Sequence, residues 1–291
     1  MTIRDLKIFI AVAECGKMNL AAKKLYISQP SVSQTIQELE KYYGVKLFER
    51  LSQRLYITDV GKELLPYAYH IVDSYNKAEE MLQHAGEQPV IRIGASITVG
   101  TCFLEGLVDT VEKTTDIKIN AVIDNTTTIE HMVLNSALDI GIVEGMVESP
   151  DLIQIPLYED ELVIIAGKEH PFYTRKEIAI EELNGQSEAS REDGSQTRNQ
   201  YERLLAEKGI GLYQKWNSTN TEAIKNIVMQ GKDIAILSRM LVEKEVRNGE
   251  LSIVPVKDVQ VKREINLIYH KNKFISRSLE EFIEICRRFK R

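Results

Sequence analysis

Ala21-Ala22-Lys23-Lys24-Leu25-Tyr26-Ile27-Ser28-Gln29-Pro30-Ser31-Val32-Ser33-Gln34 is the stretch that decides how the N-terminal part folds. Its first residues predict a short helix. Ser28 is a good N-cap for the next helix, and Pro30 lies in the first turn, where a missing N–H costs little. The apolar residues of this second helix form one stripe at helical spacing, namely Val32, Ile36, Leu39 and Tyr43, and Gly44 ends it. The stretch therefore predicts two helices joined by a tight turn.

The residues on either side extend this pattern. Before the stretch, apolar residues repeat at helical spacing until Gly16, namely Leu6, Phe9, Ile10 and Ala13. After it, Leu47–Glu49 and Leu55–Thr58 predict two short strands, joined by Arg50-Leu51-Ser52-Gln53-Arg54. Residues 1–58 therefore predict a helix–turn–helix followed by a two-stranded wing.

The polar face of the helix that Ser28 begins is suited to a DNA groove. A helix in the major groove presents polar side chains near its N-terminus to base edges, and Gln can pair with adenine. Arg50 and Arg54 flank the wing tip and suit phosphates or a minor groove. The alternative for Arg50 is a salt bridge with Glu49 or Glu40. The candidate DNA-binding residues are Ser28, Gln29, Pro30, Ser33, Gln34, Gln37, Arg50 and Arg54.

The distribution of charge supports this assignment. The chain of 291 residues has a formal net charge of −6, which argues superficially against a nucleic acid partner. Residues 1–58, however, hold nine Lys and Arg against five Asp and Glu, whereas residues 59–88 hold two against six. A basic first segment on an acidic body suggests that only the N-terminal part contacts a polyanion.

Composition bounds the class of protein. Hydrophobic residues make up 43% and charged residues 27% of the chain, as in soluble globular proteins. The aliphatic runs are too short to span a membrane, and Arg4, Asp5 and Lys7 interrupt the apolar residues at the start, so we expect neither a membrane segment nor a signal peptide. The three scattered cysteines fit a reducing cytoplasm.

Residues 59–85 predict one long helix. Its apolar residues keep helical spacing for about six turns, and they are Leu64, Leu65, Ala68, Ile71, Val72, Tyr75, Ala78 and Leu82. A lone helix cannot bury such a stripe, so a partner helix from a second copy is the favoured reading. The alternative is packing on the chain's own body. Gly86 to Pro89 predicts a linker.

From Val90 onwards, short apolar strands alternate with helical segments. The predicted strands are Val90–Ile93, Ile117–Val122, Leu138–Val143, Leu162–Ala166, Ile234–Leu237, Ile253–Val256 and Ile265–Tyr269. The predicted helices are 101–113, 129–137, 198–208, 221–230, 239–248 and 276–289. This alternation predicts two small α/β subdomains with mostly parallel sheets and a ligand site in the cleft between them.

Four turns rich in hydroxyl and amide groups each precede a predicted helix. Helix N-termini hold anions through free N–H groups and the helix dipole, and Arg191 and Arg198 bracket the third turn. The alternative for any one turn is helix capping alone. The polar segment 185–190 predicts an edge strand or an altered pocket wall. The candidate effector-binding residues are Ser96, Thr98, Thr126, Thr127, Arg191, Gly194, Ser195, Thr197, Arg198 and Asn220.

Motifs for catalysis are not evident. The chain has no Gly-rich phosphate loop, nucleophile elbow or paired-carboxylate motif, and its five histidines lack the spacing of metal ligands. We therefore expect no catalytic residues, no metal, no cofactor and no enzyme activity. Cys102, near the start of a predicted helix, leaves a redox role open.

The quoted stretch resembles the DNA-reading motif of LysR-type transcriptional regulators. Further residues match that family: Phe9, Ala13, Leu39-Glu40, Gly44, Leu47-Phe48-Glu49-Arg50, Thr58, Gly61, Leu138-Asp139-Ile140-Gly141-Ile142, His170-Pro171 and Gly231-Lys232-Asp233-Ile234-Ala235. One departure is Gln34, where many members carry a basic residue. The segment from Arg191 to Arg198 looks like a signature of a branch that includes regulators of sulfur and carbon assimilation, which implies a small anionic effector.

The resemblance implies an α/β protein with an all-α winged helix–turn–helix at its N-terminus. The expected parts are a DNA-binding domain (1–58), a dimerisation linker helix and hinge (59–88) and an effector-binding domain (89–291). The last is similar to periplasmic binding proteins, with subdomain I at about 89–160 and 265–291 and subdomain II at about 161–264. We expect a cytoplasmic homodimer or homotetramer whose binding to a promoter operator in double-stranded DNA responds to the effector. The rival interpretation is a solute-binding protein built from the same α/β module.

Overall fold

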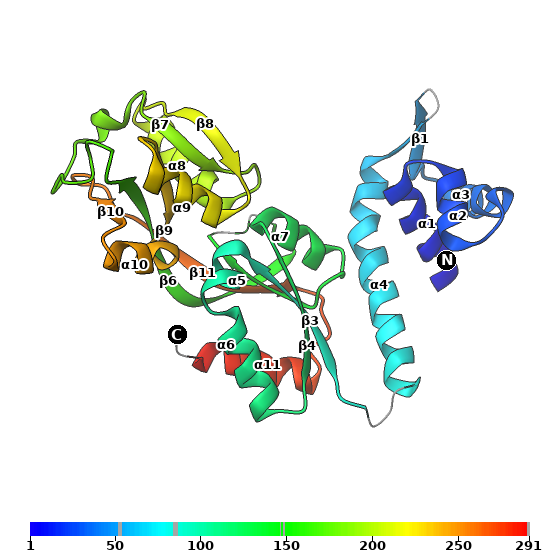
Figure 1. Ribbon diagram of the computed structural model, residues 1–291. Coiled ribbons are helices and arrows are strands. Elements are labelled where there is room, and N and C mark those ends of the chain that lie inside the picture. Colours follow the sequence, from blue (N-terminus) through cyan, green and yellow to red (C-terminus); the bar gives the residue numbers. More distant parts are fainter. Residues whose placement is uncertain (52–53, 84–86, 146, 148, 290–291) are drawn as a thin grey trace. The chain divides into compact units, whose positions relative to one another are not determined.

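The computed structural model describes residues 1–51, 54–83, 87–145, 147 and 149–289 (Figure 1). The chain forms two compact units. The N-terminal unit is Met1–Glu87 with the short pieces Leu134–Ser136 and Asn272–Phe274, and the C-terminal unit is the remainder. Ser52 and Gln53 of the expected wing tip and Gly86 of the expected linker lie outside the described residues.

The N-terminal unit confirms the predicted helix–turn–helix and wing. Its elements are α1 (Ile3–Cys15), α2 (Met18–Leu25), α3 (Gln29–Tyr43), β1 (Phe48–Leu51), β2 (Arg54–Ile57) and α4 (Asp59–Gln83). Ser28 caps α3 by accepting a bond from the Ser31 N–H at 3.3 Å. Gly44 ends α3 with φ of 68°, a left-handed conformation that favours glycine.

The core of this unit lies where α1, α2 and α3 meet. Phe9, Ala21 and Val32 are fully buried there, and the small Ala21 lets α2 approach its neighbours closely. The predicted stripe on α3 is buried only as far as Leu39. Tyr43 lies in the last turn and is exposed, with its ring edge-on to that of Tyr42. The stripe therefore ends one turn earlier than predicted.

The apolar stripe of α4 divides between two environments. Ala68 is fully buried in the core of its own unit, and Leu64, Leu65 and Val72 pack around it. The alternative of packing on the chain's own body is therefore right for this side of the helix. Ile71, Tyr75 and Leu82 instead stay exposed, at 39%, 42% and 73% of their surface.

The C-terminal unit is built on a mixed sheet. Its strands are β3 (Val90–Ser96), β4 (Lys118–Asp124), β5 (Ile140–Glu144), β6 (Leu152–Gly167), β7 (Ser187–Arg191), β8 (Tyr213–Ser218), β9 (Ile234–Ser238), β10 (Leu251–Val254) and β11 (Val261–His270). Within the described residues, their order is β4-β3-β5-β11-β6-β9-β7-β8, with β10 paired to β6.

The two longest strands explain why the prediction of a mostly parallel sheet is only half right. β3 is parallel to β4 and β5, and β7 is parallel to β8 and β9. β6 and β11 are antiparallel to each other over their common length. The chain crosses once along β6 and returns along β11, so these strands run in opposite directions. They join a first half, containing β3 to β5, to a second half, containing β7 to β10 (Figure 1).

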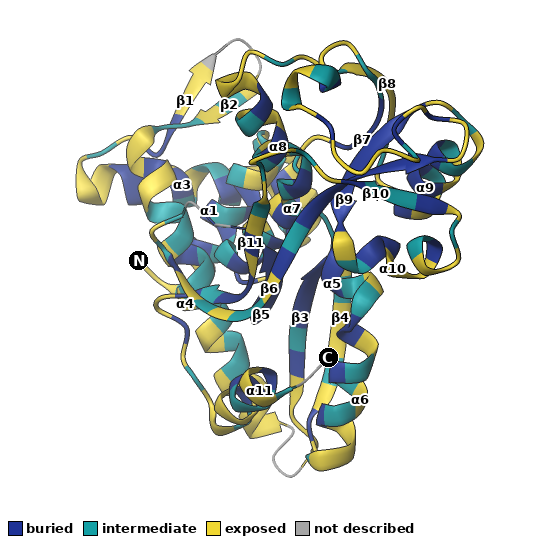
Figure 2. Ribbon diagram, turned by 90° about the vertical axis from the view of Figure 1, so that its left-hand side faces the viewer, coloured by how far each residue is buried: buried dark blue, intermediate teal, exposed yellow. Residues whose placement is uncertain are grey.

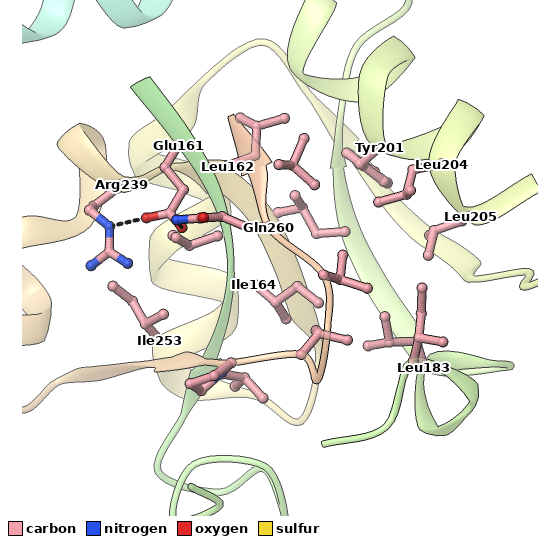
Figure 3. A pocket seen from close by; sticks show the side chains of 18 residues that line it. Glu161, Leu162, Ile164, Leu183, Tyr201, Leu204, Leu205, Arg239, Ile253 and Gln260 are labelled. Atoms are coloured by element: carbon pink, nitrogen blue, oxygen red, sulfur yellow. Dashed lines mark hydrogen bonds and ion pairs between the residues drawn. The ribbon is translucent and has the colours of Figure 1, made fainter. Parts of the chain in front are cut away.

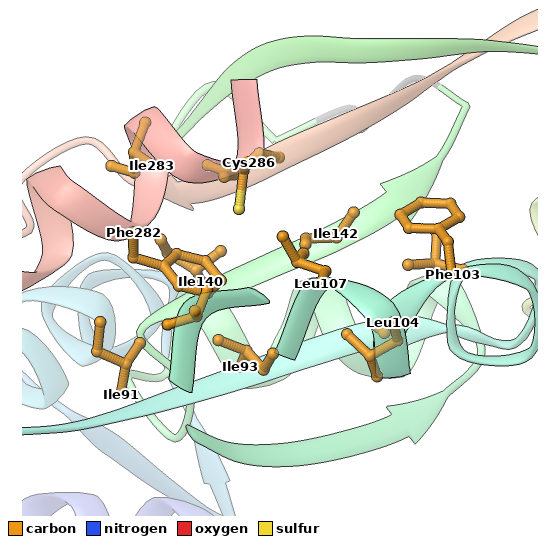
Figure 4. Packing of buried hydrophobic residues seen from close by; sticks show 14 of the residues in the cluster. Ile91, Ile93, Phe103, Leu104, Leu107, Ile140, Ile142, Phe282, Ile283 and Cys286 are labelled. Carbon is orange, nitrogen blue, oxygen red and sulfur yellow. The ribbon is translucent and has the colours of Figure 1, made fainter. Parts of the chain in front are cut away.

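Helices cover the sheet in both halves. The helices are α5 (Ile97–Cys102), α6 (Leu104–Thr114), α7 (Thr126–Leu134), the 3₁₀ turn Ile180–Leu183, α8 (Gln196–Glu207), α9 (Thr221–Gln230), α10 (Arg239–Arg247) and α11 (Arg277–Arg288). In the first half, α6 and α11 lie side by side, and Leu107 and Phe282 pack with Ile93 and Ile140 of the sheet (Figure 4). Burial of this apolar surface supplies the main driving force for folding.

β7 overturns the first alternative for 185–190, an edge strand. It lies between β9 and β8 and is largely buried (Figure 2, dark blue). Its polar side chains are accommodated by hydrogen bonds: Ser187 donates to Asp233, and Glu188 accepts from the hydroxyl of Tyr201. A polar strand is tolerated in the interior because its side chains find partners there. β8, which the sequence did not predict, forms the edge.

Candidate functional sites

The start of α3 presents its polar side chains to solvent. Gln29, Pro30, Gln34 and Gln37 are exposed, while Ser33 is half-buried. Gln34 donates a hydrogen bond to Glu38 one turn later, at 2.8 Å. Gln29 and Gln37 therefore remain the amides on this face that make no recorded bond to the described residues. They are available to hydrogen-bond another molecule.

Tyr26 is a surface residue that the sequence reasoning did not select. It occupies the turn before α3 with φ of 53°, and 96% of its surface is exposed. A left-handed conformation is uncommon for a residue other than glycine. The signal available in the sequence was its place in the turn between the two helices.

The wing carries two exposed arginines. Arg50 pairs in register with Leu55, and Arg54 with Leu51. Both side chains are exposed, and no ion pair is recorded for either within the described ranges. The alternative of a salt bridge from Arg50 to Glu49 or Glu40 is therefore not observed in these ranges.

Glu40 instead holds the start of the wing against α3. It is 8% exposed and accepts bonds from the backbone N–H groups of Leu47 at 2.9 Å and Phe48 at 3.2 Å. Lys46 donates to its other oxygen at 2.7 Å. These three hydrogen bonds compensate for the burial of the carboxylate. Glu40 thus positions the strands that carry Arg50 and Arg54.

In the C-terminal unit, a buried polar cluster joins the two halves. We define it as Thr98, Glu144, Asp160, Thr197 and Arg263. The Arg263 side chain is fully buried; its Nε donates to Asp160 at 2.7 Å and its Nη1 to Thr197 at 2.9 Å. Its Nη2 lies 3.5 Å from Thr98, whose hydroxyl donates to Glu144 at 3.2 Å. One guanidinium therefore links helix starts from both halves.

Only two members of the buried polar cluster, Thr98 and Thr197, are among the predicted effector-binding residues. Arg263, Glu144 and Asp160 were missed. The alternation of side chains along β11 could have identified Arg263, because Arg263 and the buried Ile265 are two residues apart and lie on the same face of the strand. A charged residue on the inward face of a strand indicates a buried partner.

Four buried polar atoms, one of them in this cluster and three in predicted effector-binding residues, lack a hydrogen-bond partner in the part of the chain that the structure describes. They are Thr126 Oγ1, Arg191 Nη1, Ser195 Oγ and Glu144 Oε2. A buried polar group without a partner costs about 1–3 kcal/mol and is rare in native proteins. Ser195 begins α8 but makes no capping bond there. Thr126 and Ser195 therefore do not use their hydroxyls for the capping that the alternative proposes.

The starts of α7 and α8 are adjacent. The hydroxyl of Thr127 donates to the carbonyl of Gly194 at 3.0 Å, so a predicted residue of the first half contacts one of the second. The Asn125 amide lies beside Gly194, whose φ is 87°. The structure thus brings Thr126, Thr127, Gly194 and Ser195 together.

Other predicted effector-binding residues have partners of their own. Ser96 and Asn220 cap α5 and α9, as the capping alternative proposes, and Asn220 is exposed. Arg198 pairs with Asp193 at 2.6 Å and with Glu202 at 2.7 Å, and its hydrogen bond to Glu202 raises its pKa. The buried Arg191 pairs with Glu192 through two nitrogens, at 2.8 and 3.0 Å.

Glu188 titrates in an unusual range. It is 3% exposed, and this burial raises its pKa from 4.5 to about 7. The nearby Glu202 carboxylate acts in the same direction, whereas Arg198 opposes it. Glu188 lies three residues before Arg191 on β7, so a proton binds close to the predicted effector residues.

Comparison with known proteins gives concordant results. The model of the LysR substrate binding domain matches residues 84–291, and that of the bacterial regulatory helix-turn-helix protein, lysR family, matches residues 3–62. The HTH-type transcriptional regulator CysL of Bacillus subtilis is 32% identical, over 97% of this chain and 95% of CysL. The rival interpretation as a solute-binding protein is therefore wrong.

Solved structures show the same architecture. The regulatory domain of Synechocystis PCC6803 CcmR, in complex with 2-PG, is 26% identical with a TM-score of 0.64, covering 69% of this chain and 97% of that one. An H2O2-bound mutant of Corynebacterium glutamicum OxyR is 25% identical with a TM-score of 0.60, covering 99% of this chain and 92% of that one. Among the described residues, no helix is long and apolar enough to cross a membrane. Taken together, the helix–turn–helix, the two-half effector domain and these matches establish that the chain belongs to the LysR family of bacterial regulatory helix–turn–helix proteins.

Proposed function

We propose that this LysR-type transcriptional regulator reads its operator through the exposed start of α3. Gln29, Ser33 and Gln34 would contact base edges, and Gln37, Arg50 and Arg54 would contact phosphates or a minor groove. The observation that supports this is the exposed amide of Gln29 beside the Ser28 cap. We further propose that it works in the cytoplasm, where operator DNA is found, and without enzyme activity.

We also propose that a small oxyanion binds between the starts of α7 and α8. The support is the group of buried donors without a partner in the described residues, namely Thr126 Oγ1, Ser195 Oγ and Arg191 Nη1. An oxyanion would accept from these groups and from helix N-terminal N–H groups. That the regulatory domain of CcmR was solved in complex with 2-PG agrees with a small ligand in this domain.

The effector would also carry a hydrogen atom to donate. Glu144 Oε2 is buried without a partner in the described ranges, and a second carboxylate, Asp160, shares Arg263 with it. A fully deprotonated anion would meet repulsion from Glu144. A protonated oxyanion or a hydroxy acid would instead place a donor on that oxygen.

A thermal-shift screen tests the effector proposal. Sulfate, sulfite, phosphate and small hydroxy acids would be compared with neutral analogues of similar size. A ligand at 100 times its dissociation constant stabilises the fold by about 2.7 kcal/mol. Thr126→Val and Ser195→Ala should each reduce the response, whereas Thr219→Val, an exposed threonine before α9, serves as the matched control. Stabilisation by neutral compounds alone would contradict the proposal.

For assembly, we propose that α4 forms the dimer contact. Ile71, Tyr75 and Leu82 are apolar positions on its exposed side, next to the side that packs on the chain's own core. A second copy of α4 would cover them by parallel or antiparallel helix packing. Dimerisation would place two α3 helices on one operator.

A further inference from the structure

A cavity of about 260 Å³ lies in the second half of the C-terminal unit, away from the buried polar cluster (Figure 3). Its walls come from β6, β10, α8 and the segment between β10 and β11. Most of the lining is apolar, including Leu162, Ile164, Leu183, Leu204, Leu205 and Val256. Apolar cavities of this kind gain free energy when an apolar ligand replaces water or void.

One end of this cavity is polar. Arg239 Nε donates to Glu161 at 2.6 Å, and the Gln260 amide donates to the other oxygen of Glu161 at 2.8 Å (Figure 3, dashed line to Arg239). Arg239 is 46% exposed on its side chain, and its two terminal nitrogens make no recorded hydrogen bond to the described residues. A guanidinium held at Nε can still bind a carboxylate through those nitrogens.

The charges at this end favour an anion. Burial opposes ionisation of Glu161, but the hydrogen bonds from Gln260 and Arg239 and the positive charges of Arg239 and Lys262 together lower the pKa of its carboxyl. Glu161 has Arg239 as its ion-pair partner and Lys262 opposite it on β11, so two cationic residues lie near one carboxylate. A ligand with a single negative charge would complete the balance.

We propose that this cavity binds an amphipathic monocarboxylate, with its carboxylate on Arg239 and its apolar body among Ile164, Leu183 and Leu205. The cavity is just below the roughly 300–1,000 Å³ of typical ligand pockets, so the ligand is smaller than a drug-sized molecule. Medium-chain fatty acids fit this description. None of the predicted effector-binding residues lines the cavity, so the proposal does not depend on the oxyanion site.

Consecutive side chains in β6 form the ion pairs of the two sites. Asp160 pairs with Arg263 in the buried polar cluster, whereas Glu161 pairs with Arg239 at the cavity. Successive side chains of a strand point to opposite faces of the sheet. Glu161 therefore lies on the face of β6 opposite to Asp160, whereas Leu162 and Ile164, which also line the cavity, share the face of Asp160.

The experiment is calorimetric titration of the full chain with octanoate, and with octanol as a neutral probe of matched length. Octanoate should bind saturably, and octanol about tenfold more weakly, because only the carboxylate makes charged hydrogen bonds. Arg239→Gln should remove this preference, so that the two probes bind alike. Arg247→Gln, an exposed arginine on the same helix, is the matched control and should keep the preference.

A second variant tests the apolar body. Leu204→Trp should fill the cavity and abolish binding of both probes, whereas Arg203→Gln, exposed on the same helix, should not. Ser195→Ala should leave octanoate binding unchanged. The proposal is overturned if octanoate does not saturate, if octanol binds as tightly, or if Ser195→Ala removes binding while Leu204→Trp retains it. Because Arg239→Gln alters an exposed side chain, the test stands even if Leu204→Trp fails to fold.

Discussion

The polar face of α3 and the buried polar cluster both place polar side chains at helix starts, but in opposite surroundings. Gln29 and Gln37 lie in water, whereas Thr98, Thr197 and Arg263 are buried. A hydrated side chain keeps its hydrogen bonds to water when it is alone, so it adds little to folding. A buried side chain must find partners within the protein. Changes on α3 should therefore alter binding alone, and changes in the cluster should alter stability.

Removing Arg263 is expected to give the largest effect. Arg263→Met leaves Asp160 and Glu144 buried without their cation, which costs about 3–5 kcal/mol. Urea unfolding of the full chain, followed by far-UV circular dichroism, measures the loss. Glu264→Gln, an exposed neighbour on β11, is the control. A loss in the free energy of unfolding below about 1 kcal/mol would show that the buried polar cluster adds no more to stability than the exposed face of α3.

The exposed side of α4 should become buried when two copies of the chain form a dimer, so substitutions there should affect assembly. Ile71→Glu would place an unpaired charge in the contact and weaken dimerisation by several kcal/mol. Light scattering measures the mass, and circular dichroism checks the fold. Glu80→Gln, exposed on the same helix but on the side opposite to Ile71, should leave the mass unchanged. A folded Ile71→Glu protein with the wild-type mass would remove α4 from the assembly.

Glu188 makes the interior pH-sensitive. Because its pKa is about 7 when folded and 4.5 when free, the folded chain keeps a proton that the unfolded chain loses between these values. The free energy of unfolding therefore falls by up to about 3 kcal/mol as the pH rises from 4.5 to 7, and this group changes it no further above pH 7. Glu188→Gln should flatten this part of the stability–pH curve, measured by urea unfolding, whereas Glu207→Gln should not. Parallel curves for wild type and Glu188→Gln would show that the carboxyl is ionised in the fold.

Gln29→Ala should give the smallest effect, and on binding alone. Loss of its amide should weaken operator binding by about 1–3 kcal/mol and leave both non-specific binding and the unfolding midpoint unchanged. Fluorescence anisotropy with operator and random duplexes measures both affinities. Gln230→Ala, an exposed amide at the end of α9, is the control. An equal loss on random DNA would mean that Gln29 contacts the backbone.

The sequence predicts the elements with local signals well and the buried contacts between distant residues poorly. The helices and wing of the N-terminal unit have strong local signals, such as the Ser28 cap and the stop at Gly44. Local spacing also located most strands of the C-terminal unit. Tyr43 and the far side of α4 were harder, because burial at the end of a stripe depends on what packs against it.

The buried polar cluster could not be predicted for a related reason. Arg263 lies far along the chain from Thr98 and Thr197, and no spacing rule connects such distant residues. β7 was misjudged because its polarity was considered without its partners, Tyr201 and Asp233. Hydroxyl-rich helix starts were visible in the sequence, but whether each one caps or stays unpaired is a property of the folded chain.

The last elements of the chain complete the core of the first half. Phe282 of α11 and Leu267 of β11 pack with Ile93 of β3, which is near the beginning of the domain. During translation, α1 to α4 can fold as soon as they leave the ribosome, since domains fold as units from the N-terminus. The first half must wait for the final helix. A prematurely terminated chain would therefore carry a folded α3 joined to a sheet whose apolar face is exposed. Chaperones and proteases would bind that exposed surface before the chain could bind an operator.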